Sequence, residues 1–441
     1  MLSKLKPFYI YTFTTFFTAG VSFVVFSFLT HSLNAADYGV INLYSAFCIF
    51  MTPFIGLGMQ VMLGVDFFKL SEGDFKHQFV NAMALPLLAT LGFTALFAVF
   101  HRQVEALLHV NTVFAVTFPL CCFMILVSDI FLVQLRNRGN HLGFAAVSIV
   151  KNLVEVSTTV LFIYFIPLAW KGRLLGSNAA LLVSLLIAIY LVRRWRLMEG
   201  KFESSKLKAN FRIGLPLVPE RLAIFVFSFS DRFFIDHFST VKDVGQYSAG
   251  AQISVIVRLM IVTLLTTFQP GILRELAREQ INFAALRKIN LQFIAVCLAT
   301  MLGMLALTPL IFRFFIGAAF QEGQAYAFFL TLGMFFSGLQ SMFMTYLLFL
   351  KKNKLLMVTS LVGVVTCCAL NYVNVSYFGP IGATYTSVAV YALMSGITLY
   401  FVNQFYGLRK LLGGNPLRRQ ATPPPAGEPE PPRVKETAGG E

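Results

Sequence analysis

Four basic side chains fall inside long apolar segments of the chain: Lys151, Arg221, Arg232 and Arg258. A charge at the centre of a bilayer costs roughly 3 kcal/mol even on lenient insertion scales, so such residues usually face a water-filled cavity or a partner. Guanidinium groups bind phosphate oxygens through two parallel hydrogen bonds. The four residues therefore predict a site for an anionic, phosphate-bearing ligand.

The three arginines have a spacing that favours a shared site. Arg221 and Arg232 are separated by about three turns of helix, which puts them on nearly the same face and about 16 Å apart along the axis. Arg258 lies near the middle of the next apolar segment. The spacing predicts one cationic wall that binds a diphosphate. Alternatively, Glu220 and Asp231 neutralise nearby arginines at an interface, or Arg232 reaches the outer surface.

Three carboxylates in or near the apolar segments are candidates for proton or ion coupling, and nothing in the spacing selects one of them: Glu155, Glu220 and Asp231. Lys151 and Glu155 are four residues apart on one expected helix, where an ion pair would relieve the burial cost of both. The spacing favours this simple pair, although Lys151 stays a candidate for diphosphate binding. Asp129 could pair with a nearby arginine or reach water.

Two prolines stand near the start of the seventh apolar segment, at Pro216 and Pro219. Proline removes a backbone donor and favours a kink or an unwound turn, so the pair predicts a hinge. The alternative is an ordinary helix start, since proline is tolerated in the first turn.

The cysteines and histidines have no metal-ligand spacing, and we expect neither a metal nor any other cofactor. All six cysteines fall within apolar segments and are interpreted as small core residues: Cys48, Cys121, Cys122, Cys297, Cys367 and Cys368.

The composition of the chain predicts that membrane-spanning helices position these residues. The chain has 441 residues, of which 57% are hydrophobic and 12% charged, more apolar surface than a water-soluble core of this size can hide. The apolar stretches are about 20 residues or longer, the length of a membrane-spanning helix. Unbroken apolar runs such as residues 179–190 are not the alternating pattern of a transmembrane barrel. The sequence predicts an all-α polytopic membrane protein.

The pattern predicts about twelve transmembrane helices in two parallel six-helix lobes. The N-terminal lobe covers residues 1–192 and the C-terminal lobe residues 213–408, joined by a basic cytoplasmic linker at 193–212. Residues 409–441 form a basic and then Pro/Glu-rich tail, which we expect to be disordered. The expected spans are 7–30, 40–63, 79–100, 112–135, 143–166, 174–192, 213–235, 244–269, 289–312, 325–350, 355–377 and 380–401.

The two halves share a short internal repeat at a constant offset of 206. With six helices in each half, both halves have the same orientation, so an axis along the membrane normal should relate them. A cavity between two lobes is the expected consequence. The matching residues are Phe28, His31, Asp37 and Gly39 in the first half, and Phe234, His237, Asp243 and Gly245 in the second.

Charge placement predicts the orientation. Of the Lys and Arg residues up to Arg419, 24 fall on the side that carries both termini and five on the other, so both termini should be cytoplasmic. The net charge of +15 is explained by anionic membrane lipid, and no nucleic-acid partner is expected. The first apolar segment is too long for a signal-peptide core and is interpreted as a retained helix.

Four short motifs occur near the starts and ends of the first, second, seventh and eighth apolar segments: Asp37–Gly39 with Asn42–Tyr44, Gly214–Pro216, Asp231–Ile235 and Val244–Tyr247. Through these motifs, over residues 1 to about 401, the chain resembles the O-antigen flippases, the polysaccharide-exporter branch of the multidrug/oligosaccharidyl-lipid/polysaccharide (MOP) flippase superfamily. This resemblance implies a MATE-like bundle of twelve helices that alternates between inward and outward openings around a cationic cavity. It implies transport of an undecaprenyl-diphosphate-linked oligosaccharide across a bacterial inner membrane for surface polysaccharide biosynthesis.

The expected partners are the lipid-linked glycan, a polysaccharide polymerase and glycosyltransferases, and we expect a monomer. Relatives that flip the peptidoglycan precursor carry arginines on the first helix, whereas the first two predicted spans here contain no Lys or Arg. That difference makes the peptidoglycan precursor a less favoured cargo.

Two other functions are compatible with the sequence. A multidrug or cation antiporter of the same superfamily should prefer acidic cavity residues, which the basic excess here disfavours. A membrane enzyme of polysaccharide assembly usually presents a large outer loop with catalytic residues, and the expected outer loops here are short.

Overall fold

The computed structural model describes residues 2–413, and this part of the chain is built from α-helices with short connections. Of the tail predicted at 409–441, the first residues belong to α17 (Leu408–Leu412) and are helical, contrary to the expected disorder, and residues 414–441 lie outside the described residues. The first lobe contains α1 (Leu2–Ser32), α2 (Ala35–Gly56), α3 (Met59–Lys69), α4 (Glu72–Val99), α5 (His101–Leu108), α6 (Thr112–Asn137), α7 (His141–Val160) and α8 (Trp170–Arg194).

The second lobe is joined to the first by α9 (Ser204–Gly214), which occupies part of the expected linker. Its other helices are α10 (Val218–Phe229), α11 (Asp231–Phe238), α12 (Val241–Leu276), α13 (Phe283–Phe315), α14 (Gly323–Phe349), α15 (Asn353–Phe378) and α16 (Pro380–Tyr406).

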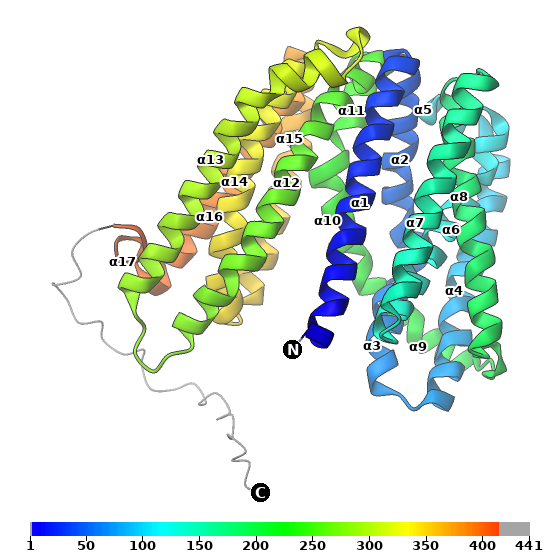
Figure 1. Ribbon diagram of the computed structural model, residues 1–441, viewed down its shortest axis with the longest axis horizontal. Helices are drawn as coiled ribbons and strands as arrows, with labels where there is room; N and C mark the ends of the chain where they lie inside the picture. Colours follow the sequence, from blue (N-terminus) through cyan, green and yellow to red (C-terminus); the bar gives the residue numbers. More distant parts are fainter. Residues whose placement is uncertain (1, 414–441) are drawn as a thin grey trace, which may run out of the picture.

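Eleven helices of the described chain are long and apolar enough to cross a membrane, and there are twelve spans if Ser204–Phe229 and Asp231–Phe238 form one broken span. The prediction of an all-α membrane protein with about twelve spans in two lobes is therefore confirmed. Their lengths match the roughly 20 residues that about 30 Å of hydrocarbon requires. The two lobes are visible as two groups of helices in Figure 1.

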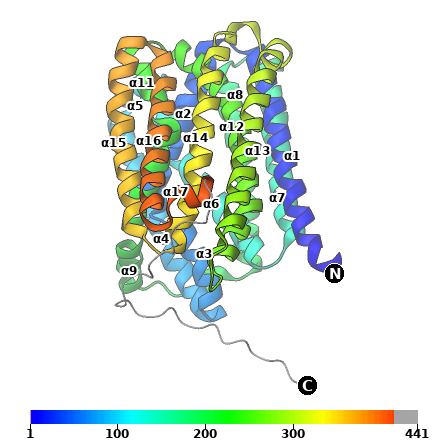
Figure 2. The same cartoon turned by 90° about the vertical axis from the view of Figure 1, so that its left-hand side faces the viewer.

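The lobes lie close together at one end and diverge towards the end that carries the N-terminus (Figure 1). Figure 2 shows α13, α14, α16 and α15 side by side across the C-terminal lobe, in agreement with their packing contacts. Along α12, residues 244–254 are mostly buried, whereas residues 258–260 are exposed. This change occurs between the end where the lobes meet and the end where they diverge (Figure 1). The first half of α12 is thus packed between the lobes, whereas its second half faces an opening.

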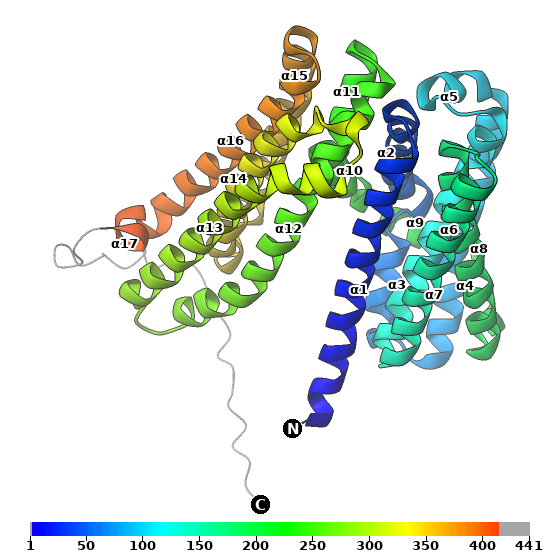
Figure 3. The ribbon, with the colours of Figure 1, turned by 45° about the horizontal axis from the view of Figure 1, so that its top comes forward.

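The seventh span runs between the lobes. Its helical structure begins at Ser204, earlier than the expected residue 213, and passes through a 3₁₀ turn at Leu215–Leu217. The α10 helix then contacts both α2 and α15, and the chain bends by 53° before α11. Figure 3 shows α10 and α11 between the two helix groups. This span is the covalent and physical bridge between the lobes.

The C-terminal end of the second span is also broken, which the sequence did not predict. Leu57 and Gly58 have positive φ angles of 44° and 70°, and the chain continues as α3. The break brings the Leu57 carbonyl so close to Gly214 that a Cβ on Gly214 would lie 1.9 Å from this oxygen. Only glycine permits this approach of the seventh span to the N-terminal lobe.

The repeat offset of 206 also relates the starts of α2 and α12. Asn34 caps α2 by accepting a hydrogen bond from the Asp37 backbone N–H, at 2.8 Å. Thr240 caps α12 in the same way through Asp243, whose carboxylate accepts the Thr240 N–H to complete a capping box. Equivalent residues therefore begin equivalent helices.

The same offset relates the contact that closes the two lobes. A Cβ on Gly39 would lie 1.9 Å from the Val241 carbonyl oxygen, and a Cβ on Gly245 would lie 1.8 Å from the Ala35 carbonyl oxygen. Since Val241 is the repeat partner of Ala35, the contact is reciprocal, as in a two-fold interface. Because glycine has no side chain, Gly39 and Gly245 allow the backbones of α2 and α12 to come into direct contact where the helices cross.

We expect Gly245→Ala to loosen this closure, because the added methyl group must push α12 away from Ala35. Overpacking of this kind costs about 1–3 kcal/mol, enough to shift a two-state equilibrium strongly. Spin labels on Gln103→Cys and Glu322→Cys, both exposed at the closed end, should report a longer distance in the variant by electron–electron double resonance.

Gly396→Ala is the matched control, because nothing lies within 4 Å of its added Cβ. It should leave the label distance unchanged. Identical distance distributions for Gly245→Ala and the parent protein would show that the glycine crossing does not hold the lobes together.

Candidate functional site

The charged side chains within the spans gather in three clusters. One lies in the C-terminal lobe, and the other two lie on the N-terminal lobe, where Arg221 of α10 contributes to one of them.

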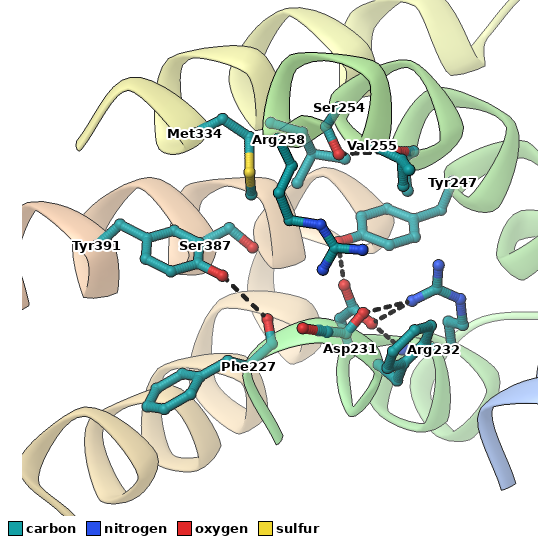
Figure 4. Close-up of a pocket in the computed structure, with 14 residues that line it drawn as sticks. Phe227, Asp231, Arg232, Tyr247, Ser254, Val255, Arg258, Met334, Ser387 and Tyr391 are labelled. Carbon is teal, nitrogen blue, oxygen red and sulfur yellow. Dashed lines mark hydrogen bonds and ion pairs between the residues drawn. The ribbon is translucent and has the colours of Figure 1, made fainter. Parts of the chain in front are cut away.

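The C-terminal cluster surrounds Asp231, at the start of α11. Asp231 accepts a hydrogen bond from Arg232 Nη1 at 3.0 Å and another from the Tyr247 hydroxyl, while Arg232 Nη1 also donates to the Ser228 carbonyl at 3.1 Å. Asp231 and Arg232 are both buried, and a buried charge is tolerated because its partner of opposite charge is close by. Arg258 reaches over this pair from α12 (Figure 4).

These residues line a small cavity of about 60 Å³. Unlike Arg232, Arg258 is exposed, and no carboxylate in the described part of the chain forms an ion pair with it. The cluster contains two guanidinium groups and one carboxylate, so it presents one uncompensated positive charge. That charge belongs to Arg258, because Arg232 and Asp231 neutralise each other.

The first N-terminal cluster contains Asp129 of α6, Lys151 of α7 and Arg221 of α10. Asp129 and Arg221 line a pocket of about 230 Å³ bounded by α2, α3, α6 and α10. Lys151 donates to the Ser128 hydroxyl at 3.3 Å and is within electrostatic range of Asp129. Two cations again accompany one carboxylate, which leaves one net positive charge.

The second N-terminal cluster is the pair of Glu155 on α7 and Arg173 on α8. Arg173 Nη2 lies 2.6 Å from a Glu155 carboxylate oxygen, and Arg173 Nη1 donates to the Thr159 hydroxyl at 3.2 Å. The predicted ion pair between Lys151 and Glu155 is therefore wrong, since Lys151 turns towards α6 and Glu155 towards α8. Arg173 was not among the predicted site residues, because the sixth span was expected to begin at residue 174. In the structure α8 begins at Trp170 and therefore includes Arg173.

The predicted wall of three arginines is divided by the bend before α11. Arg232 and Arg258 line one cavity, whereas Arg221 lines the pocket beside Asp129 in the other lobe. A straight helix would have kept Arg221 and Arg232 on one face, but the 53° change of direction separates them. Glu220 is exposed and lines neither cavity.

The prolines lie away from the main bend. Pro216 is in the 3₁₀ turn, Pro219 is in the first turn of α10, and the bend occurs at Ser230. Their role as a hinge stays a prediction.

A largely apolar groove of about 840 Å³ lies between α1 and the helices α12 and α13. It adjoins two of the charged clusters. Ser22 and Gln252 line both this groove and the pocket that holds Glu155 and Arg173, and Val255 lines both the groove and the Arg258 cavity. An apolar channel and two polar sites thus meet on one side of α12.

A family model described as "Polysaccharide biosynthesis protein" matches residues 5–274, more than half of the chain. The chain belongs to this family. No curated protein matches it by sequence.

Solved structures resemble this chain in fold at low sequence identity. The lipid II flippase MurJ in an inward closed conformation superposes with a TM-score of 0.73 at 14% identity, covering 91% of this chain and 88% of MurJ. An inward-facing MATE family multidrug resistance transporter of the MOP superfamily gives 0.69 at 12% identity, with coverages of 88% and 94%. The MATE multidrug transporter DinF-BH gives 0.58 at 16% identity, with coverages of 92% and 94%.

The remaining polar groups do not form a metal centre. Within residues 2–413, no group of three or more His, Cys, Asp or Glu side chains is placed to hold a metal ion. All six cysteines are free, and all but Cys368 are buried.

A double-mutant cycle on Arg173→Ala and Glu155→Ala should reveal a coupling of about 1–3 kcal/mol in the free energy of unfolding, since the pair is largely shielded from water. Each single substitution strands a charged group, so the double variant should be more stable than additivity predicts. Denaturant titration in detergent micelles measures the four proteins.

The exposed pair of Glu203 and Lys206, with an N–O distance of 3.0 Å, is the matched control. Its coupling should stay below about 0.5 kcal/mol. Additive effects at Arg173 and Glu155 would mean that this pair is electrostatically unimportant.

Proposed function

We propose that this protein is a flippase that moves an undecaprenyl-diphosphate-linked oligosaccharide from the cytoplasmic to the periplasmic leaflet, for surface polysaccharide biosynthesis. The observation that carries the proposal is the junction of an apolar groove with the cationic cavity of Arg258 beside α12. A lipid-linked glycan has the same division into an apolar chain and an anionic headgroup. Family membership supports a role in polysaccharide assembly.

The charges match a diphosphate in sign. Arg258 and the cluster around Arg221 lie in separate cavities, and each presents one uncompensated positive charge to a ligand whose two phosphates each bear one negative charge. Arg258 is exposed, so its guanidinium group is available to bind phosphate oxygens in a fork. Lys151 and Arg232 support these sites through their hydrogen bonds to Ser128 and Asp231.

The groove is suited to the prenyl chain. Its lining includes Phe16, Phe23, Leu259 and Met260, and several of these side chains are exposed along α1 and α12. Since α1 belongs to one lobe and α12 to the other, the groove lies at the seam between them. A substrate can therefore enter from the bilayer with its apolar chain still in an apolar environment, so only the headgroup must leave water.

The wide end of the structure faces the cytoplasm in this proposal. Both termini and most of the basic residues belong to that side, as the positive-inside rule requires of a protein of the bacterial inner membrane. The two solved structures with TM-scores of 0.73 and 0.69 are described as inward closed and inward-facing, which supports the same assignment. In this proposal, the structure corresponds to a state with its outer side closed that receives substrate from the cytoplasmic side.

Transport follows when the glycine crossing opens and the inner side closes, an alternating-access cycle. The seventh span can absorb the change at its bend, with Pro216 and Pro219 as a second hinge. Glu155, Glu220 and Asp231 are the candidates for proton or ion coupling. A polysaccharide polymerase and glycosyltransferases act before and after this step, and the protein works as a monomer.

Arg258→Ala and Arg221→Ala should each reduce the flipping rate at least about tenfold, because each removes a charge-assisted hydrogen bond to phosphate. The assay reconstitutes each variant in liposomes with a fluorescent undecaprenyl-diphosphate-linked sugar and follows its appearance in the accessible leaflet. Arg258→Lys should be intermediate, since lysine keeps the charge but loses the planar fork.

Arg313→Ala is the control, because Arg313 is exposed at the outer end of α13, away from both cavities. It should flip at the parental rate. Parental rates for both Arg258→Ala and Arg221→Ala would remove the proposed diphosphate role.

Gly20→Trp should block the lipid chain without disturbing the fold. Gly20 lines the groove, and nothing lies within 4 Å of an added Cβ, so a large side chain has room to fill the channel. In the same liposomes, the flipping rate should fall at least about tenfold, because the tryptophan side chain excludes the prenyl chain of the lipid from its apolar site.

Gly92→Trp, on α4 and equally open around its Cβ, is the matched control and should flip normally. Equal activity of Gly20→Trp and Gly92→Trp would place the prenyl chain elsewhere.

A further inference from the structure

The pocket that contains Glu155 and Arg173 differs chemically from the other two charged sites. It has a volume of about 180 Å³ and is lined mainly by α1, α2, α7 and α8 of the N-terminal lobe, with Gln252 contributed by α12 of the other lobe. Its two charged side chains are a cation and a carboxylate that pair with each other, so it has no net charge to offer a phosphate. Its polar lining otherwise consists of amides and hydroxyls.

The side chains of this lining present both acceptors and donors to the cavity. Asn42 and Asn152 each use one amide N–H to bind a carbonyl of their own helix, at 2.8 Å, which leaves the side-chain oxygen and the second N–H of each available. The Ser22 and Ser45 hydroxyls donate to their own helices in the same way. Glu155 adds a carboxylate, which only accepts.

This donor and acceptor balance discriminates between ligands. A phosphate diester has only acceptor oxygens, so it would leave the acceptors of the pocket without a donor, and the Glu155 carboxylate already compensates the charge of Arg173. A sugar hydroxyl donates a hydrogen bond, so several hydroxyls can satisfy several acceptors at once. Arg173 and Gln252 supply the donors that the ring oxygen and the hydroxyl oxygens need.

The size and the walls of the pocket also suit one sugar ring. A cavity needs about 10–15 Å³ on this measure to hold one water molecule, so a pocket of about 180 Å³ has room for a group much larger than water. Phe26 and Tyr38 add aromatic surface, which can pack against the C–H face of a pyranose.

The position of the pocket connects it to the lipid site. Ser22 and Gln252 are shared with the apolar groove, so a headgroup attached to a chain in that groove can reach the pocket. Gln252 is two turns, about 10 Å, below the glycine crossing at Gly245. The pocket therefore lies just inside the closed outer end, and its two walls belong to different lobes.

We propose that this pocket binds a neutral, hydroxyl-bearing sugar ring of the lipid-linked glycan and so contributes to substrate selection. The proposal rests on the proposed flippase function. Separation of α2 from α12 would withdraw Gln252 from the other wall of the pocket, so opening of the outer end would release the sugar.

The test compares binding of undecaprenyl diphosphate with that of the same lipid carrying one glucose, galactose or N-acetylglucosamine. Equilibrium titrations use the full-length protein in lipid nanodiscs. At least one glycosylated lipid should bind the parent protein about tenfold more tightly than bare undecaprenyl diphosphate, the effect of one or two hydrogen bonds.

Asn152→Leu and Asn42→Leu should each remove most of this gain while leaving the affinity for bare undecaprenyl diphosphate within about twofold, because neither residue lines the apolar groove. Both substitutions conserve approximate volume and replace a polar group of the pocket lining with an apolar one. Gln103→Leu, exposed on α5, is the matched control and should keep the gain.

The outcomes separate the two proposals. If no lipid binds, both fail. If every lipid binds equally well, or if the gain survives in both pocket variants, the sugar pocket is excluded while the flippase proposal stands. Loss of the gain only in the pocket variants supports the inference.

Discussion

The architecture depends on the backbone contact between α2 and α12 at Gly39 and Gly245. Each glycine faces a carbonyl of the other helix, at Val241 or Ala35, so side chains are excluded from the crossing. The contact is reciprocal because both helices start at equivalent caps, and the repeat brings the same surface to both sides. Such a contact is narrow and confined to one end. The lobes can therefore be sealed at that end while they diverge at the other.

The second constraint is the cost of a charge in hydrocarbon, and the clusters meet it in different ways. Asp231 with Arg232, and Glu155 with Arg173, form close ion pairs. Arg258 has no such partner in the described chain, and its exposed side chain lines the cavity beside Asp231. The neutral pairs are suited to shaping cavities and presenting hydrogen-bonding groups. An uncompensated cation is suited to holding an anion, and the proposed division between sugar and diphosphate follows from this difference.

The sequence was sufficient for the large-scale fold, because apolar runs of span length and a repeat with constant offset depend on local patterns. Gly39 and Gly245 were already paired by that offset, although their mutual contact was not foreseen. The side-chain partners were harder to predict. The expected Lys151–Glu155 pair failed because helical spacing says which residues can meet on one helix, but not which neighbouring helix attracts them. Arg173 was missed because the boundary of its span was misplaced by a few residues. The expected common face of Arg221 and Arg232 failed because no proline or glycine marks the bend at Ser230.

A structure of the protein bound to an undecaprenyl-diphosphate-linked glycan, determined by electron cryomicroscopy in lipid nanodiscs, tests the account most directly. The account predicts the prenyl chain between α1 and α12, a phosphate oxygen within hydrogen-bond distance of the Arg258 guanidinium, and a sugar ring beside Asn152 and Gln252. A headgroup bound away from the space between the lobes, with Arg258 facing no phosphate, would contradict it.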